Sequence, residues 1–332
     1  MFGKTFKRVP PSSRRQALGR ALCVALAVYG SASYAQTSII KLMVGFPAGG
    51  ATDVLARSLA EKLGPLLQTT VIVENKAGAG GQIAAQALKA AAPDGTTFFL
   101  SHDHTVSILP LVVKNPGFDP AKDFVPVAGF ATFVNALAVS SNTPAKSFND
   151  YVAWVKTQGN KGNVGIPAPA SVPEFLVKVL GEKYRLDLQA APYRGSAPMM
   201  ADMLGNQIGA GVASVPDFIE HHKSGKIRVV AVLGSTRQAA LPDVPTFAEL
   251  GLAGFEDVPY YGIFAPAGTP KAAIDRFSDA LAKVIAMPDV RERLTAMGLT
   301  VGHMPPAQLG KTEQAYAQTW ARIIKASGFQ AQ

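Results

Sequence analysis

Short apolar runs alternate along this chain with longer segments in which apolar residues recur every three or four positions. The first pair is the apolar run at 39–44 and a segment with leucines at positions 55, 59 and 63. Between them lies the sequence Gly-Phe-Pro-Ala-Gly-Gly-Ala-Thr-Asp, residues 45–53. This order predicts a strand, a glycine-rich turn and a helix.

The same alternation continues to the end of the chain. The expected strands lie at 39–44, 70–73, 96–100, 135–139, 163–166 and 227–233. The expected helices lie at 82–92, 148–158, 174–180, 271–286 and 307–326. A repeated strand–helix–strand order predicts an α/β protein whose mostly parallel sheets are covered by helices on both faces.

The glycine-rich turn at 45–53 is a candidate anion site. A helix N-terminus presents free backbone N–H groups and the positive end of the helix dipole. Glycine lets the backbone approach a ligand closely because it has no Cβ. The turn therefore predicts a small, negatively charged ligand, although a purely structural turn accounts for the same residues.

The first 35 residues have the layout of a bacterial export signal. Six basic residues and no acidic one precede the apolar run 21–29, and the small-residue site 33–35 follows. This order predicts cleavage after Ala35 and a periplasmic location. The apolar run is shorter than the roughly 20 residues that span a bilayer. Residues 13–18 resemble a twin-arginine signal, and the sequence leaves the general and twin-arginine export routes open.

Cleavage would change the charge and the cysteine content. The whole chain has a net charge of +9, but without the signal 26 basic residues remain against 23 acidic ones, about +3. This removes most of the case for a nucleic-acid partner. The single cysteine, Cys23, lies inside the signal, so the mature chain would have no disulfide, thiol nucleophile or cysteine metal ligand.

Seven spaced motifs together resemble one family. They are Phe-Pro-Ala-Gly-Gly-Ala-Thr-Asp at 46–53, Val-Glu-Asn-Lys-Ala-Gly-Ala-Gly-Gly at 73–81, Ala-Pro-Asp-Gly at 92–95, Pro-Tyr-Arg-Gly-Ser-Ala-Pro at 192–198, Gly-Lys-Ile-Arg at 225–228, Leu-Pro-Asp-Val-Pro-Thr at 241–246, and Tyr-Gly-Ile-Phe-Ala-Pro-Ala-Gly-Thr-Pro at 261–270. The chain resembles the periplasmic solute-binding proteins of tripartite tricarboxylate transporters, the Bug family.

The resemblance implies a two-lobed periplasmic binding protein fold, type II-like, with a hinge of two crossing strands. Lobe 1 would be discontinuous, with residues 37–138 and 257–332, and lobe 2 would comprise residues 139–256. The crossings would lie near 131–139 and 256–264. Such a fold permits closure around a ligand.

The resemblance also implies ligand-binding residues in lobe 1. The implied residues are Phe46, Ala48, Gly49, Gly50, Thr52 and Asp53 in the first loop, and Ala79 and Gly80 in the second. Backbone amides of the first loop would hold a ligand carboxylate, and Thr52 could donate its hydroxyl. Asp53 has two open roles, since it could favour the helix dipole or receive a cationic group of the ligand.

In lobe 2 the implied ligand residues are Ser171, Glu174 and Tyr193. Glu174 stands where the family has a histidine, so it would either repel a ligand carboxylate and attract an amine, or only support the helix N-terminus. Ser196 is expected to cap a helix. One of the tyrosines at 260–261 could cover the ligand.

The sequence His-Asp-His at 102–104 follows the third predicted strand. The two histidines would share a strand face, but no third metal ligand is evident, and we expect no metal site. The resemblance places this loop at the cleft edge, where Ser101 or His104 would recognise the ligand; a surface or structural role for these residues stays open. A histidine there would make binding depend on pH between 5.5 and 8.

The chain lacks the sequence motifs of serine hydrolases, P-loop proteins and zinc peptidases. We therefore expect no enzyme and no cofactor, and treat an exported hydrolase as the weakest alternative. The resemblance implies a monomer that captures a small carboxylate and delivers it to the membrane subunits of its transporter. A sensory partner of a membrane histidine kinase would share the same binding step. The sequence leaves open whether the ligand is a di- or tricarboxylate, an amino acid or an aromatic acid.

Overall fold

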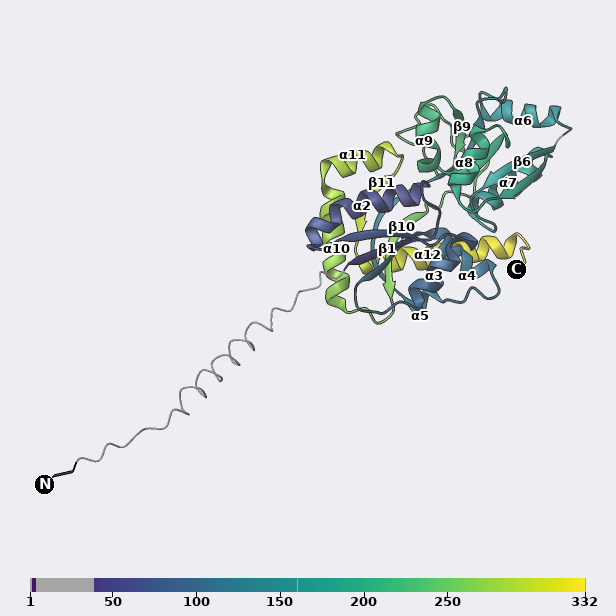
Figure 1. Ribbon diagram of the computed structural model, residues 1–332. Coiled ribbons are helices and arrows are strands. Elements are labelled where there is room, and N and C mark those ends of the chain that lie inside the picture. The colour runs from purple at the N-terminus through teal and green to yellow at the C-terminus, as the bar shows by residue number, and fades with distance from the viewer. Residues whose placement is uncertain (1, 4–38, 160, 332) are drawn as a thin grey trace. The chain divides into compact units, whose positions relative to one another are not determined.

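The computed structural model describes residues 2–3, 39–159 and 161–331. The expected export signal and its cleavage site after Ala35 lie outside the described residues, apart from positions 2–3. Within the described ranges, no helix is both long enough and apolar enough to cross a membrane. The described residues from 39 onward form one compact unit, and it contains two sheets (Figure 1).

The first sheet has the strand order β11-β4-β10-β3-β1-β2. Its strands are β1 (Ile40–Val44), β2 (Val71–Asn75), β3 (Thr97–His102), β4 (Phe124–Thr132), β10 (Tyr260–Pro266) and β11 (Thr300–Met304). β1 pairs in parallel with β2 and β3, as predicted, but β10 runs antiparallel to both β3 and β4. The prediction of a mostly parallel sheet is therefore wrong for this half, because β10 returns from the second sheet and enters in the opposite direction.

Helices cover both faces of the first sheet. They are α2 (Ala51–Leu67), α10 (Lys271–Ala286) and α11 (Pro288–Ala296) on one face, and α3 (Gln82–Lys89), α4 (Leu109–Val112) and α12 (Pro306–Ala326) on the other, with the short α5 (Pro120–Asp123) leading into β4. Successive side chains of β1 point to opposite faces of the sheet. Leu42 and Val44 pack with α2 on one face, whereas Met43 packs with α3 on the other. This alternation is the pattern expected of a strand buried on both faces.

The second sheet has the order β7-β6-β8-β5-β9. Its strands are β5 (Asn135–Ser140), β6 (Lys161–Ile166), β7 (Asp187–Pro192), β8 (Ala210–Ser214) and β9 (Ile227–Val232), and its helices are α6 (Phe148–Thr157), α7 (Val172–Tyr184), α8 (Ser196–Leu204) and α9 (Val215–Lys223). β6 pairs in parallel with β7 and β8, while β5 is antiparallel to β8 and β9. This sheet is also mixed, because β5 enters it from the first sheet.

The chain passes between the sheets twice, at residues 133–134 and again at 233–259. The two passages lie together, since the Phe133 N–H donates to the Pro259 carbonyl at 3.0 Å. β5 begins at Asn135, so the lobe boundary expected at 138 falls inside a strand of the second sheet. The lobe boundaries themselves stay a prediction.

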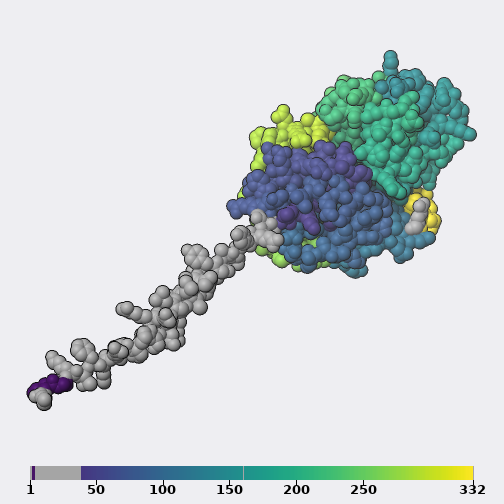
Figure 2. Space-filling model, viewed as in Figure 1, coloured from purple at the N-terminus to yellow at the C-terminus, as the bar shows by residue number. Residues whose placement is uncertain are grey.

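The end of the chain provides a third link between the two halves. Trp320 of α12 packs against Phe175 of α7 with ring centroids 5.6 Å apart, and Phe329 approaches the same ring at 5.8 Å. Lys178 of α7 also donates to the Ser327 carbonyl at 3.3 Å. The yellow C-terminal segment accordingly lies beside the teal second half in Figure 2.

A buried carboxylate holds the predicted turn between β1 and α2. Asp53 accepts hydrogen bonds from the Gly49 N–H at 3.0 Å, from the Asn75 amide at 2.9 Å and from the Arg57 guanidinium at 3.0 Å. Burial alone would raise the pKa of Asp53, but the hydrogen bonds from Arg57, Gly49 and Asn75 outweigh it and lower the pKa below 3.8. Asp53 is thus a structural anchor of the loop.

Replacing Asp53 by alanine is expected to lower the free energy of unfolding by about 2 kcal/mol, because the Gly49 N–H and the Asn75 amide lose their charged acceptor. Urea denaturation measures this loss. The contribution is fully present above the unfolded pKa of 3.8 and is lost as the pH falls through the lower folded pKa, so the difference between the two proteins should shrink as the pH is lowered below 3.8.

The matched control is Asp275→Ala, which removes a carboxylate that pairs with the exposed Lys271 on α10. This change should cost about 0.5 kcal/mol or less. Equal losses in the two variants would show that Asp53 does not anchor the turn.

Candidate functional site

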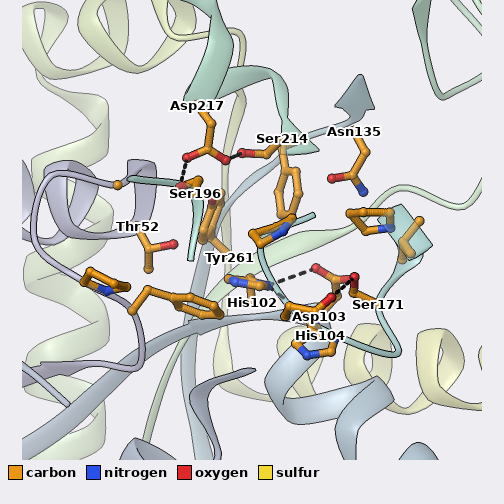
Figure 3. Close-up of a pocket in the computed structure, with 18 residues that line it drawn as sticks. Thr52, His102, Asp103, His104, Asn135, Ser171, Ser196, Ser214, Asp217 and Tyr261 are labelled. Atoms are coloured by element: carbon orange, nitrogen blue, oxygen red, sulfur yellow. Dashed lines mark hydrogen bonds and ion pairs between the residues drawn. The ribbon is translucent and has the colours of Figure 1, made fainter. Parts of the chain in front are cut away.

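A cavity of about 600 Å³, counting the space at its mouth, is lined by residues from the segments of both sheets. The lining consists of Phe46, Pro47, Gly50, Thr52, His102, Asp103, His104, Phe133 and Tyr261 on the side of the first sheet, and Asn135, Pro167, Ala168, Ser171, Val172, Pro173, Ser196, Ser214 and Asp217 on the side of the second. Figure 3 shows these side chains around the cavity. It is the candidate ligand site.

Aromatic rings surround His102, the last residue of β3. The His102 ring stacks on Phe46, with centroids 4.9 Å apart and planes at 22°. The rings of Tyr261 and Phe133 meet it edge-on, at 5.8 and 6.1 Å. Burial raises the pKa of Tyr261, as does the nearby Asp217 carboxylate, and hydrogen bonds with Thr52 and Ser214 offset part of this rise. Tyr260 does not line the cavity; its hydroxyl lies 2.8 Å from the Ser107 hydroxyl.

His104 lines the cavity but does not share a strand face with His102. β3 ends at His102, and the chain turns into a π-helix at His104–Ile108. Burial and the neighbouring His102 lower the pKa of His104 to about 4, and its Nδ1 has no hydrogen-bond partner. This lowered pKa favours a neutral ring between pH 5.5 and 8 and argues against the expected pH dependence of binding, which stays a prediction.

The described residues contain no group of three or more His, Cys, Asp or Glu side chains arranged to hold a metal ion. Ser101, the other ligand residue expected in this loop, is fully buried without a hydrogen-bond partner for its hydroxyl and does not line the cavity.

The second glycine-rich loop lies behind His104. It forms a 3₁₀ turn at Ala79–Gly81, and neither Ala79 nor Gly80 lines the cavity. A Cβ on Gly80 would lie 2.5 Å from His104 Nε2, and one on Gly81 would lie 2.4 Å from the Thr105 hydroxyl. The Thr105 hydroxyl donates to the Gly80 carbonyl at 2.8 Å. The glycines of this loop therefore allow it to pack closely against the residues after β3.

The first loop supplies Phe46, Gly50 and Thr52 to the cavity, whereas Ala48 and Gly49 are exposed outside it. Two of its amides are already engaged by carboxylates of the chain. The Gly49 N–H donates to Asp53, and the Ala51 N–H donates to Oδ1 of Asp217 at 3.1 Å. These amides were expected to hold the carboxylate of a ligand.

In the loop before α7, polar groups are likewise hydrogen-bonded within the chain. Ser171 lines the cavity and donates its hydroxyl to the Ala168 carbonyl at 2.6 Å. Glu174 lies outside the lining, and its Oε2 accepts the Ala170 N–H at 2.6 Å. Of the two roles left open for Glu174, the structure shows the support of the helix entry.

Tyr193 also lies outside the cavity lining. Its hydroxyl donates to Asp202 at 2.8 Å, and burial together with Asp202 raises the pKa of Tyr193 to about 12. A Cβ on Gly165 would lie 3.3 Å from the Tyr193 ring, so this tyrosine packs within the second half of the chain.

Asp217, in the first turn of α9, joins residues from three elements. Besides the Ala51 N–H of α2, its Oδ1 accepts the Ser196 hydroxyl, and its Oδ2 accepts the Ser214 hydroxyl, both at 2.5 Å. These two contacts are drawn as dashed lines in Figure 3. The expectation that Ser196 caps α8 is wrong, since Gly195 is the N-cap residue and the Ser196 hydroxyl is bonded to Asp217.

Several lining residues were not among the candidates from the sequence: His102, Asp103, Asn135, Ser214 and Asp217. The sequence Ser-Val-Pro-Asp at 214–217 predicts a helix start with an acidic residue in its first turn. It contains no sign that the acid reaches α2, because Ala51 lies 166 residues away.

Comparisons with known proteins agree with this fold. The family profile described as "Tripartite tricarboxylate transporter family receptor" matches residues 55–329. Protein BugT of Bordetella pertussis is 30% identical over 87% of this chain and 89% of its own. The structure of the periplasmic binding protein BugD is 32% identical, with a TM-score of 0.84 over 89% of this chain and 99% of that one.

Two further solved structures contain a ligand. MatC from Rhodopseudomonas palustris with bound malate is 28% identical, with a TM-score of 0.79 over 86% of this chain and 98% of that one. R. palustris Rpa4515 with adipate is 28% identical, with a TM-score of 0.83 over 89% and 98% of the two chains.

These likenesses confirm the α/β periplasmic binding protein fold that the motifs implied. The matched family is one of solute receptors and not of enzymes, which confirms that expectation as well. By its family profile and its relatives, the chain belongs to the tripartite tricarboxylate transporter receptors of the Bug family.

Proposed function

We propose that this protein is a periplasmic receptor that captures a small carboxylate-bearing solute and delivers it to the membrane subunits of a tripartite tricarboxylate transporter. The observation that carries this proposal is the cavity lined by residues of both sheet segments, in a chain of this receptor family. The related structures with malate and adipate hold small carboxylates.

The proposed ligand contacts are donors that line the cavity. The Thr52 side chain and the Asn135 amide lie at its wall, whereas the Ser171 hydroxyl beside them already donates to the Ala168 carbonyl. Hydrogen bonds from such groups to an ionised carboxylate are shorter and stronger than those between neutral groups. The stacked ring of His102 with Phe46 supplies an apolar surface for the carbon skeleton of the ligand.

We propose that the protein has two lobes that close on the ligand around the passages at 133–134 and 233–259. Lobe 1 would comprise 37–134 with 257–332, and lobe 2 would comprise 135–256, so that β5 lies wholly in lobe 2. Export with cleavage after Ala35 would deliver the mature protein to the periplasm as a monomer.

A thermal-shift screen against small carboxylates tests the proposed function. At a concentration 100 times its dissociation constant, a ligand that binds only the folded protein adds about 2.7 kcal/mol of stability. For a chain of this size that corresponds to a rise of roughly 4 °C in Tm. The panel should contain mono-, di- and amino-carboxylates, with glucose and acetamide as neutral controls. Stabilisation by the neutral compounds alone would refute a carboxylate receptor.

Replacing Thr52 by valine removes a hydroxyl from the cavity with little change in volume. We expect the best carboxylate of the screen to bind about tenfold more weakly, the effect of losing about one hydrogen bond to a charged group. Isothermal titration calorimetry measures this change. Thr295→Val on α11, an exposed position outside the lining, is the matched control. Equal affinities for the Thr52→Val variant and the unmodified protein would exclude a ligand contact at Thr52.

Because the folded pKa of His104 is about 4, its neutral ring contributes no pH dependence to binding between pH 5.5 and 8. The affinity of a His104→Asn variant should therefore follow the same pH profile as that of the unmodified protein. Stability should differ: the unfolded histidine takes up a proton below pH 6.5, whereas the folded one does so only near pH 4. Between pH 7.5 and 4.5 the unmodified protein should lose about 2 kcal/mol more than the variant. Parallel stability profiles would contradict the neutral, buried histidine.

A further inference from the structure

The charged side chains that line the cavity are acidic, which disfavours a ligand with several negative charges. Its lining contains two carboxylates, Asp103 and Asp217, and no lysine or arginine. Asp103 has His102 as a neighbour, with 3.3 Å between Oδ1 and Nδ1. A second carboxylate on a ligand would enter a site that already holds like charges.

Asp217 has only neutral partners. Its three hydrogen bonds come from the Ala51 N–H and the hydroxyls of Ser196 and Ser214, and among the described residues no cation pairs with it. A carboxylate offers about four lone-pair sites, so these three donors leave one acceptor site unused. The side chain lines the cavity and is only partly buried. Its negative charge is therefore available to a cation in the cavity.

The α2 N-terminus is also less open to a ligand anion than the loop sequence predicts. The Ala51 N–H, the first of α2, is bonded to Asp217, and the Gly49 N–H is bonded to Asp53. The negative charge that this helix end favours is thus supplied by the chain itself. A ligand group beside Asp217 is better matched if it carries a positive charge.

A different group is available for the ligand carboxylate. Asn135, at the start of β5, is 6% exposed and lines the cavity, and its side-chain amide makes no hydrogen bond with any other described residue. Figure 3 shows this amide facing the cavity. A buried amide without a partner is costly unless a ligand or water satisfies it, so it marks a position for a polar ligand group.

We infer that Asp217 selects ligands that bear an amino group together with a carboxylate, holding the ammonium while the Asn135 amide and the Thr52 side chain hold the carboxylate. This inference rests on the proposed function and narrows its ligand class from small carboxylates to amino-carboxylates. Asp217 thereby sets the charge of the ligand, and the neutral donors set its orientation.

Matched ligands test this inference by calorimetry. One series is succinate, malate and aspartate, which differ only in a hydrogen, a hydroxyl or an ammonium at one carbon. The other is butyrate, succinate and 4-aminobutyrate, which differ in the group at the end of the chain. In at least one series the amino member should bind at least tenfold more tightly than every counterpart without nitrogen.

The Asp217→Asn variant removes the charge but keeps an oxygen that can accept from Ala51 and Ser196. It should reduce the preference for the amino ligand at least tenfold. Glu220→Gln, on the exposed side of the same helix α9, removes one negative charge away from the cavity and should leave the preference unchanged. The ligand series on the unmodified protein tests the inference even if the Asp217 variant does not fold.

Tighter binding of succinate, malate or butyrate than of the amino members would overturn the inference while leaving the proposed carboxylate receptor intact. An unchanged preference in a folded Asp217→Asn variant would also overturn it. Failure of every carboxylate to bind, with or without an amino group, would instead refute the proposed function itself.

Discussion

The hydrogen bond from a backbone N–H to a carboxylate of the chain is the interaction on which this site depends. At the helix entries around the cavity, Asp53 accepts from Gly49, Glu174 from Ala170, and Asp217 from Ala51. Helix N-termini leave amide groups without partners inside the helix, and an acid nearby satisfies them and matches the dipole. The first two bonds fix loops locally, while the third connects α2 beside the first sheet to α9 beside the second. The backbone N–H groups that the sequence indicates as an anion site are therefore partly bonded to carboxylates of the chain itself.

Much of the fold could be predicted because its strands and helices carry clear periodic patterns. The strand–turn–helix at the start of the described chain is present as β1 and α2, and the amphipathic segments near the end are α10 and α12. β8 was missed because its sequence, Ala-Gly-Val-Ala-Ser, has few large apolar side chains. The reason is packing: a Cβ on Gly211 would lie 2.7 Å from the sulfur of Met203. The antiparallel direction of β10 was missed because it depends on the side from which the chain re-enters the first sheet. A local sequence pattern carries no information about that.

Residues of the site could be predicted where a loop has a recognisable sequence motif. Phe46, Gly50, Thr52, His104 and Ser171 all line the cavity, although their contacts with a ligand stay a prediction. The roles of the acids could not be read in the same way. Asp53 and Glu174 each fitted two roles, and only the distances to Gly49 and Ala170 distinguish them. Asp217 depends on a contact across 166 residues, which no local pattern contains.

The C-terminal segment links the two halves of the molecule at a place outside the cavity. An aromatic cluster of Phe175, Trp320 and Phe329 joins the end of α12 to α7. The first residues of α7 line the cavity. Any separation of the two sheets must bend α12 or pull these rings apart, and the second course exposes apolar surface to water. The segment from Trp320 to Phe329 therefore opposes separation of the two sheets, although none of its side chains lines the cavity. If the two lobes close on a ligand as proposed, removing this segment would change how readily the lobes separate while leaving every residue of the cavity lining unchanged.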